Sequence, residues 1–448
     1  MGTVKSVRVA FCVVLVFMLF VISCDEYRDL RYGAILFQQG SEAVSGDSVL
    51  KNADGSIIIA GNSGNNLWVA KIDSNTDVVW EKIYDTGGPD AKKNNTRIIA
   101  LDDGGYLIAT VLSQSYGDGS YNVWLIQTDD SGNTVWEKTW HTENQSTVRS
   151  LTKTTDGNYL VAGTIYNSAD SQVNGWILKT DNTGSCIWQK RYTQFNIISS
   201  VRPIGSGQYL VAGYTDYDDD TVGVFDAAAM IIDTNGTVLK AQSYGRISMT
   251  LKIKSAVAMP DGGYLLAGDA IGSRGTGAPD SNCIFIKVDE NLALQWQTEY
   301  DFNTDVDAIT SVVATSDGGA VALGFGWTGT IIHNRDVFCM KISADGTSQW
   351  QKLYELGISG EAEYGYDIHE TQDGFTASGN VALQGFVMGM DENGDIPGAD
   401  IDIRNGSITG HSLSLVSYED MKDVYNTEAE ETAVASTVTA INSGITKL

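Results

Sequence analysis

Short apolar runs separated by Asp-Gly turns set the pattern of the chain, and residues 154–192 show it most fully. The turn Asp156-Gly157 leads into one apolar run, a polar loop precedes a second, and an Asp-x-x-Gly turn precedes a third that contains Trp188. Apolar runs bounded by turn residues predict β-strands, and Asp-Gly between two runs predicts a tight hairpin because Gly tolerates positive φ. We therefore expect three short antiparallel strands in this stretch.

Versions of this unit recur along the chain. The recurring turn begins at Asp54, Asp103, Asp156, Ser206, Asp261, Asp317 and Asp373, so successive copies lie 49, 53, 50, 55, 56 and 56 residues apart. One strand is expected before each turn and three after it. The last strand carries an aromatic residue in most copies, namely Trp80, Trp136, Trp188, Trp296 and Trp350, with Leu239 in its place in the fourth copy. Four short strands at a period of about 50 residues indicate propeller blades. The sequence thus predicts an all-β fold, a seven-bladed β-propeller of four-stranded blades.

The two ends of the repeat region suggest how the ring closes. The seventh copy has no Trp strand after Gly394, whereas residues 32–38 form an apolar run ahead of the first copy. We expect this N-terminal strand to complete the seventh blade, because a closed ring leaves no open edge there. Residues 399–404 are the alternative for that strand. The propeller is expected over residues 32–404, and residues 405–448, which have few large apolar side chains, are expected to form a tail that is partly disordered or laid along the propeller.

The repeated Trp is expected in the core between neighbouring blades rather than at a ligand site. The spacing Asp-x-x-Gly-x-x-x-Trp, as from Asp181 to Trp188, resembles the Trp-docking motif of quinoprotein-like propellers, and the repeat length resembles that of kelch-like propellers. The resemblance implies that the Trp and the turn Gly lock adjacent blades together.

The first residues have the features of an export signal. Lys5 and Arg8 precede an uncharged apolar run over residues 9–22, which is short for a bilayer span and typical of a signal peptide. The sequence Val-Ile-Ser-Cys that ends at Cys24 resembles the lipobox of bacterial lipoproteins. The resemblance implies cleavage after residue 23, acylation of Cys24, a tether over residues 24–31 and a lipid-anchored place in the bacterial cell envelope, with the leaflet undecided. A plain secretory signal and an uncleaved anchor are the alternatives.

Charge limits the partners that can be expected. The chain has 29 basic and 56 acidic residues, a net charge of −27, which argues against nucleic acid as a partner. Apart from Cys24, the cysteines beyond the signal are Cys186, Cys283 and Cys339, and an odd number spread over separate repeats does not make a disulfide framework. A monomer is expected, held together by its apolar core.

A ligand site is expected on the face that carries the long loops between the second and third strands of the blades, since function concentrates on variable loops above a rigid scaffold. Aromatic and polar side chains on these loops suit a sugar, a peptide or a small ligand, although such residues are also common on ordinary surface loops. The candidates are Tyr116, Tyr121, Tyr166, Tyr217, Arg274, Trp327, His333 and Arg335.

Metal binding and catalysis find less support in the sequence. Asp391, Asn393 and Asp395 resemble the opening of a calcium loop, but Ile396 takes the place of the usual Gly, so a structural turn is preferred and no cofactor is expected. The four His residues are scattered, and there is no G-x-S-x-G motif or P-loop.

The sequence therefore predicts a protein that is not an enzyme. It is expected to act as a binding or scaffold module for a protein or an extracellular polymer. The alternative is an extracytoplasmic glycan hydrolase or lyase with its site on the long-loop face. A cluster of acidic and His residues at the mouth of the central channel would favour that alternative.

Overall fold

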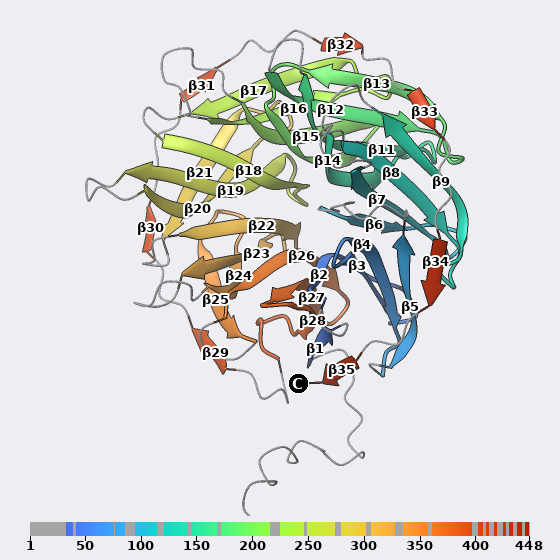
Figure 1. Cartoon of the computed structure of the whole chain (residues 1–448). Coiled ribbons are helices and arrows are strands. Elements are labelled where there is room, and N and C mark those ends of the chain that lie inside the picture. Colours follow the sequence, from blue (N-terminus) through green and yellow to red (C-terminus); the bar gives the residue numbers. More distant parts are fainter. Residues whose placement is uncertain are drawn as a thin grey trace, which may run out of the picture.

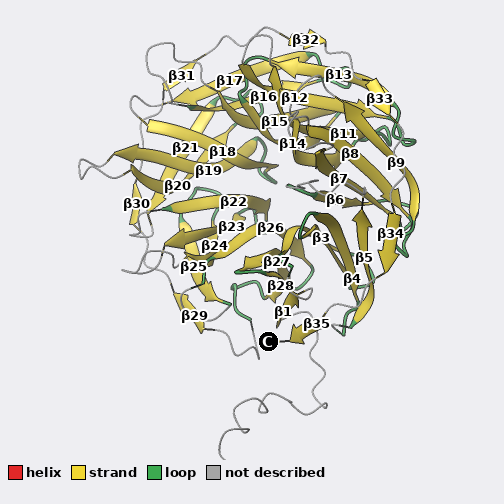
Figure 2. Ribbon diagram, viewed as in Figure 1, coloured by secondary structure: helices red, strands yellow, loops and turns green. Residues whose placement is uncertain are grey.

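Seven antiparallel sheets stand around a central axis in the computed structural model (Figure 1). The described residues are 33–38, 42–75, 77–85, 95–113, 121–141, 146–167, 172–215, 225–245, 249–273, 279–301, 306–327, 335–356, 361–396, 402–405, 409–411, 416–418, 424–426, 430–432, 437–440 and 444–447. The secondary-structure elements formed by these residues are all β-strands (Figure 2). The described residues include no helix that is long and apolar enough to cross a bilayer. The structure confirms the predicted seven-bladed β-propeller.

Each blade has four strands from the repeat region, ordered from the axis outward. Blades 1 to 3 are β2 (Val44–Lys51), β3 (Ile57–Ser63), β4 (Asn66–Ile72), β5 (Val78–Asp85); β6 (Arg97–Ala100), β7 (Tyr106–Ser113), β8 (Tyr121–Thr128), β9 (Thr134–His141); and β10 (Ser146–Lys153), β11 (Tyr159–Asn167), β12 (Gln172–Thr180), β13 (Cys186–Tyr192). Blades 4 and 5 are β14 (Ile197–Gly205), β15 (Gln208–Thr215), β16 (Asp226–Ile232), β17 (Val238–Gly245); and β18 (Met249–Ala258), β19 (Tyr264–Ser273), β20 (Pro279–Val288), β21 (Leu294–Asp301). Blades 6 and 7 are β22 (Asp307–Ala314), β23 (Ala320–Trp327), β24 (Arg335–Ile342), β25 (Ser348–Glu355); and β26 (Glu363–Thr371), β27 (Gly374–Val381), β28 (Gln384–Met390), β1 (Gly33–Gln38).

The N-terminal strand closes the ring as predicted. β1 pairs antiparallel with β28, with Ile35 opposite Val387, and so supplies the fourth strand of blade 7. The alternative segment does not close the ring, because its described part, β29 (Asp402–Asn405), pairs with β25 of blade 6. Closure leaves blade 7 without an open edge at this position.

The C-terminal residues add a fifth, outermost strand to every blade. These strands are β29, β30 (Thr409–His411), β31 (Val416–Tyr418), β32 (Val424–Asn426), β33 (Glu430–Thr432), β34 (Thr437–Ala440) and β35 (Gly444–Lys447). They visit blades 6, 5, 4, 3, 2, 1 and 7 in that order, so the segment runs around the whole ring (Figure 1). Each pairs through three or four residues. We call these seven strands the C-terminal belt. The limits expected from the sequence, residues 32–404 for the propeller and 405–448 for the tail, stay predictions.

Trp side chains of the fourth strands lock neighbouring blades. Trp80 of blade 1 is half-buried, and its Nε1 donates to the carbonyl of Asp130 in blade 2 at 2.9 Å. A Cβ added to Gly132 of the same turn would lie 3.0 Å from the Trp80 ring, so the turn needs Gly both for space and for its φ of +71°. Trp188 makes the matching bond to Thr234 at 3.0 Å. This is the packing role expected of the repeated Trp.

Blade 4 has no Trp at this position, and the structure corrects which residue takes its place. Lys240, not Leu239, takes the Trp position, because Lys240 lies opposite Ile231 as Trp80 lies opposite Lys71. The fourth strands carry a register shift just before this position, so Leu239 corresponds to the residue that points outward and is 46% exposed.

Candidate active site in the central channel

A bulge near the start of six innermost strands decides which side chains reach the central channel. The register against the second strand shifts by one residue at the same place in each, and the extra residues are Asp47, Arg149, Ser199, Lys254, Thr310 and Tyr366. A bulge breaks the strict alternation of a strand and re-aims a side chain. As a result, two successive residues of one strand line the channel, for example Tyr366 and Asp367.

The channel holds two adjoining cavities. The larger has a volume of about 530 Å³ and includes Asp47, Lys254 and Asp269 in its lining. The smaller, of about 80 Å³, includes Asp367 and His369. Their linings share further channel residues, namely Arg97, Arg149, Ser199, Lys254, Thr310 and Tyr366. The lining of the larger cavity also includes residues at the start of the first strand and at the end of the second strand of several blades. It therefore lies toward the long-loop face, where a site was expected.

Cations outnumber carboxyl groups by four to three among the described residues that line this channel, although the chain as a whole is strongly acidic. Arg97 is fixed by backbone carbonyls: its Nε donates to Arg149 at 2.9 Å, and its Nη1 donates to Thr96 at 2.9 Å. The Nε of Arg149 is buried and has no hydrogen-bond partner among the described residues. Burial lowers the pKa of both Arg149 and Arg202, and the neighbouring Arg97 lowers both further.

Asp269 is a buried carboxyl group beside a lysine. Its Oδ1 accepts a hydrogen bond from the backbone N–H of Ile309 in β22 at 3.2 Å, and its Oδ2 lies 3.4 Å from Lys254 Nζ. Burial raises the pKa of Asp269 to about 6, even though Lys254 opposes the shift. This carboxyl group can therefore carry a proton at mildly acidic pH.

Asp367 has the opposite electrostatic setting in the same channel. It accepts hydrogen bonds from Ser48 Oγ at 2.9 Å and Ser311 Oγ at 3.3 Å, and its Oδ2 lies 3.4 Å from His369 Nε2. Burial would raise its pKa, but His369, Arg97 and the hydrogen bond from Ser48 outweigh burial and hold the pKa well below its usual range. Asp367 is therefore the permanently ionised carboxylate of the pair.

The two carboxyl groups meet the same strand from opposite sides. Asp269 of blade 5 bonds to Ile309, and Asp367 of blade 7 bonds to Ser311, both in β22 of blade 6. These contact points are two residues apart, on either side of the bulge residue Thr310. Asp47 adds a third carboxyl group, which is buried, accepts from the Thr96 N–H at 3.1 Å and has a pKa raised by burial. A proton donor and an ionised carboxylate that contact one strand from neighbouring blades suit acid–base chemistry on a sugar.

The candidates from the loops are placed elsewhere. Tyr116, Tyr217, Arg274 and His333 lie outside the described residues, as does Cys24. Tyr121, Tyr166, Trp327 and Arg335 lie at or near the ends of β8, β11, β23 and β24, and the side chains of Tyr121, Tyr166 and Arg335 line neither channel cavity. The structure brings Arg335 over the rings of Phe325 and Tyr364, at 5.6 and 5.2 Å, and Phe325 in turn lines the larger cavity.

The acidic turn considered for calcium is held by its own hydrogen bonds. Asp391 Oδ1 accepts from the N–H groups of Asn393 and Asp395 at 2.8 and 2.9 Å, and Asp395 pairs with Lys352 at 2.7 Å. Within the described part of the chain, no three His, Cys, Asp or Glu side chains are grouped as metal ligands. The arrangement is that of a structural turn.

Sequence reasoning missed the channel residues although a signal for them exists. Five of the seven innermost strands carry Ser at one shared position, namely Ser48, Ser150, Ser200, Ser255 and Ser311. Arg97 and Asp367 take that position in blades 2 and 7. An alignment of the first strands would therefore have singled out both charged residues.

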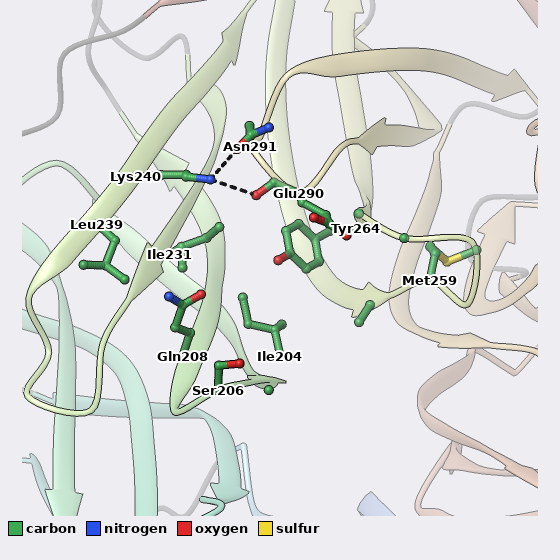
Figure 3. A pocket seen from close by; sticks show the side chains of 14 residues that line it. Ile204, Ser206, Gln208, Ile231, Leu239, Lys240, Met259, Tyr264, Glu290 and Asn291 are labelled. Atoms are coloured by element: carbon green, nitrogen blue, oxygen red, sulfur yellow. Dashed lines mark hydrogen bonds between the residues drawn. The ribbon is translucent and has the colours of Figure 1, made fainter.

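A further cavity of about 400 Å³ lies between blades 4 and 5, beside the position where Lys240 replaces Trp (Figure 3). Lys240 Nζ donates to the carbonyl of Glu290 at 3.3 Å and to the side chain of Asn291, so the lysine spans the junction that an indole spans in other blades. This cavity lies at the turns between strands, away from the channel residues.

Comparison with known proteins gives similarity of structure only. No protein-family model matches the chain, and a search of curated proteins finds no match. Among solved structures, it is similar to a GH43 endo-arabinanase from Bacillus licheniformis, with 14% identity, a TM-score of 0.32, and coverage of 58% of this chain and 99% of that one. A xylan β-1,4-xylosidase from Bacillus halodurans has 8% identity, a TM-score of 0.34, and coverage of 89% and 99%. A protein of unknown function from Dyadobacter fermentans has 11% identity, a TM-score of 0.40, and coverage of 71% and 96%.

The channel corrects the expectation that the protein is not an enzyme, because it contains the acidic and His residues that were expected to favour one. Asp367 lies 3.4 Å from His369 in the smaller cavity, and Asp269 lines the adjoining larger cavity. At such low identities and TM-scores the activities belong to those proteins alone. The chemistry of this chain has to come from its own channel residues.

Proposed function

We propose that the protein is an extracytoplasmic enzyme that hydrolyses a glycan in its central channel. The observation that carries the proposal is the approach of Asp269 and Asp367 to β22 from two different blades, at contact points two residues apart. Rigid strands hold both groups, which is what a catalytic pair needs to keep its geometry.

The two carboxyl groups have complementary roles in this proposal. Protonated Asp269 donates its proton to the glycosidic oxygen as the bond from that oxygen to the anomeric carbon breaks. Asp367 remains ionised, stabilises the positive charge that develops on the sugar, and orients the water that attacks the anomeric carbon. The attacking water gives one proton to Asp367, which passes it to the medium, and Asp269 regains a proton from the medium.

The experiment is a hydrolysis assay of the purified chain against defined neutral and acidic oligosaccharides, with new reducing ends as the readout. Wild type is expected to cleave at least one glycan class, and Asp269→Asn and Asp367→Asn to lose at least 100-fold in kcat. Asp102→Asn is the matched control, because Asp102 is exposed, lines neither channel cavity and pairs with the half-buried Lys153. Cleavage that survives both channel substitutions would overturn the proposal.

We also propose that Cys24 anchors the propeller to a membrane of the cell envelope. The support is the lipobox-like sequence alone, since Cys24 lies outside the described residues. Several acyl chains would hold a propeller stably where a single chain binds only marginally.

A further inference from the structure

We infer that the glycan taken by the channel is acidic, with a carboxylate or another anionic substituent on its sugar rings; this inference rests on the proposed function. The described residues that line the two cavities include four cations, Arg97, Arg149, Arg202 and Lys254, against three carboxyl groups, Asp47, Asp269 and Asp367. When Asp269 is protonated for catalysis, the positive excess in the channel grows.

The positive excess in the channel is opposite in sign to the charge of the chain as a whole. The chain carries a net charge of −27, whereas the described channel lining has four cations against three carboxyl groups. Buried cations without sufficient counter-charge are costly, and natural proteins keep them where a ligand supplies the missing charge. The channel walls therefore select the sign of the ligand.

Two of the arginines have capacity left for a ligand. The hydrogen bonds of Arg97 to backbone carbonyls use Nε and Nη1, which fixes the plane of its guanidinium group and leaves Nη2 without a hydrogen bond among the described residues. The Nε of Arg149 is likewise unpaired within that part of the chain. A planar guanidinium group with free N–H donors matches the two oxygens of a carboxylate, and also those of a sulfate.

The position of these arginines relative to the carboxyl groups suits a charged sugar next to the bond to be cleaved. Arg97 and Arg149 line both cavities together with Lys254, which itself contacts Asp269 at 3.4 Å. A sugar ring in the larger cavity can therefore meet the cations and the proton donor at once. A neutral sugar would leave the arginines unpaired in a drier site, which costs affinity.

The test is calorimetric binding to the full chain carrying Asp269→Asn, so that no turnover interferes. The probes are an oligogalacturonate, the same oligomer as its methyl ester, and a sulfated galactan oligosaccharide. We expect one of the two anionic probes to bind at least tenfold more tightly than the methyl ester. Arg149→Met should reduce the ratio of the two affinities at least tenfold, and Arg149→Lys should restore part of that ratio.

Controls separate this inference from the proposed function and from unfolding. Lys153→Met changes a half-buried lysine that lines neither channel cavity and should leave all three affinities unchanged. Far-UV circular dichroism shows whether each variant keeps its fold, and Arg202→Gln serves as a second variant if Arg149→Met does not. Equal or tighter binding of the methyl ester overturns the inference even if wild type cleaves glycans. Selective binding of an anionic probe without cleavage by wild type would uphold the inference and refute the hydrolase.

Discussion

The junction between blades 4 and 5 lets the packing of the whole ring be tested with two substitutions. At the other Trp junctions, a Cβ added to the turn Gly would lie 2.6–3.0 Å from the Trp of the preceding blade, which is too close for any side chain. Where Lys240 replaces Trp, the turn has Leu292 instead of Gly. Leu292 keeps a positive φ of +68° and is only 1% exposed. Trp at position 240 and Leu at position 292 should therefore exclude each other.

The magnitudes follow from these contacts. Lys240→Trp alone forces an indole against Leu292 and should cost about 1–3 kcal/mol for overpacking. Leu292→Gly alone removes a buried side chain at about 2–5 kcal/mol, of which about 1 kcal/mol is recovered when the positive φ is relieved. The double variant recreates the Trp–Gly junction of the other blades and should lie within about 1–2 kcal/mol of wild type. The coupling between the two sites is thus about 2–3 kcal/mol.

Urea unfolding followed by far-UV circular dichroism measures the free energy of unfolding of wild type, both single variants and the double variant. Coincident transitions by dichroism and by fluorescence are the condition for reading free energies from them. The double variant should be more stable than Leu292→Gly. If the two single effects simply add, within about 0.5 kcal/mol, the packing account of the Trp–Gly lock is refuted.

Three further outcomes are expected. Deletion of residues 397–448 removes the C-terminal belt and exposes the outer strand of every blade, so the thermal midpoint should fall by on the order of 5 °C and aggregation should increase; an unchanged midpoint would mean that the belt contributes nothing. Cys24→Ser should release the protein from the membrane fraction of the host cell, and continued membrane association would contradict acylation at this residue. Because the pKa of Asp269 is raised to about 6, its donor form is present below that pH and is lost above it. The rate kcat should accordingly fall about tenfold per pH unit above 6, and a rate that rises through this range would exclude Asp269 as the acid.

The fold was predictable because each repeat contains its own evidence. Apolar runs, Asp-Gly turns and a period of about 50 residues recur seven times, so an error in one copy is corrected by the others. The ring-closing strand β1 followed from spacing alone. The sequence alignment assigned Leu239 to the Trp position, one residue too early. The bulge just before Lys240 adds a residue, so the sequence alone does not show which of the two corresponds to Trp.

The channel was not predictable in the same way. Its residues come from single positions in seven distant copies, and the bulges put Tyr366 and Asp367 into one cavity although alternation would place them on opposite faces. Sequence reasoning favoured loops because they vary, yet the charged positions that break the Ser pattern, Arg97 and Asp367, lie in the innermost strands of their blades. The burial of these side chains then shifts their pKa values, and they become buried only when the ring is closed.

The most direct measurement is a crystal structure of the Asp269→Asn variant with a bound oligogalacturonate. The account predicts the sugar in the central channel, with a glycosidic oxygen within hydrogen-bond reach of the side chain at position 269 and a substrate carboxylate on Arg149 or Arg97. An oligosaccharide bound instead in the cavity beside Lys240, or only on the outer loops with the channel empty, would contradict it.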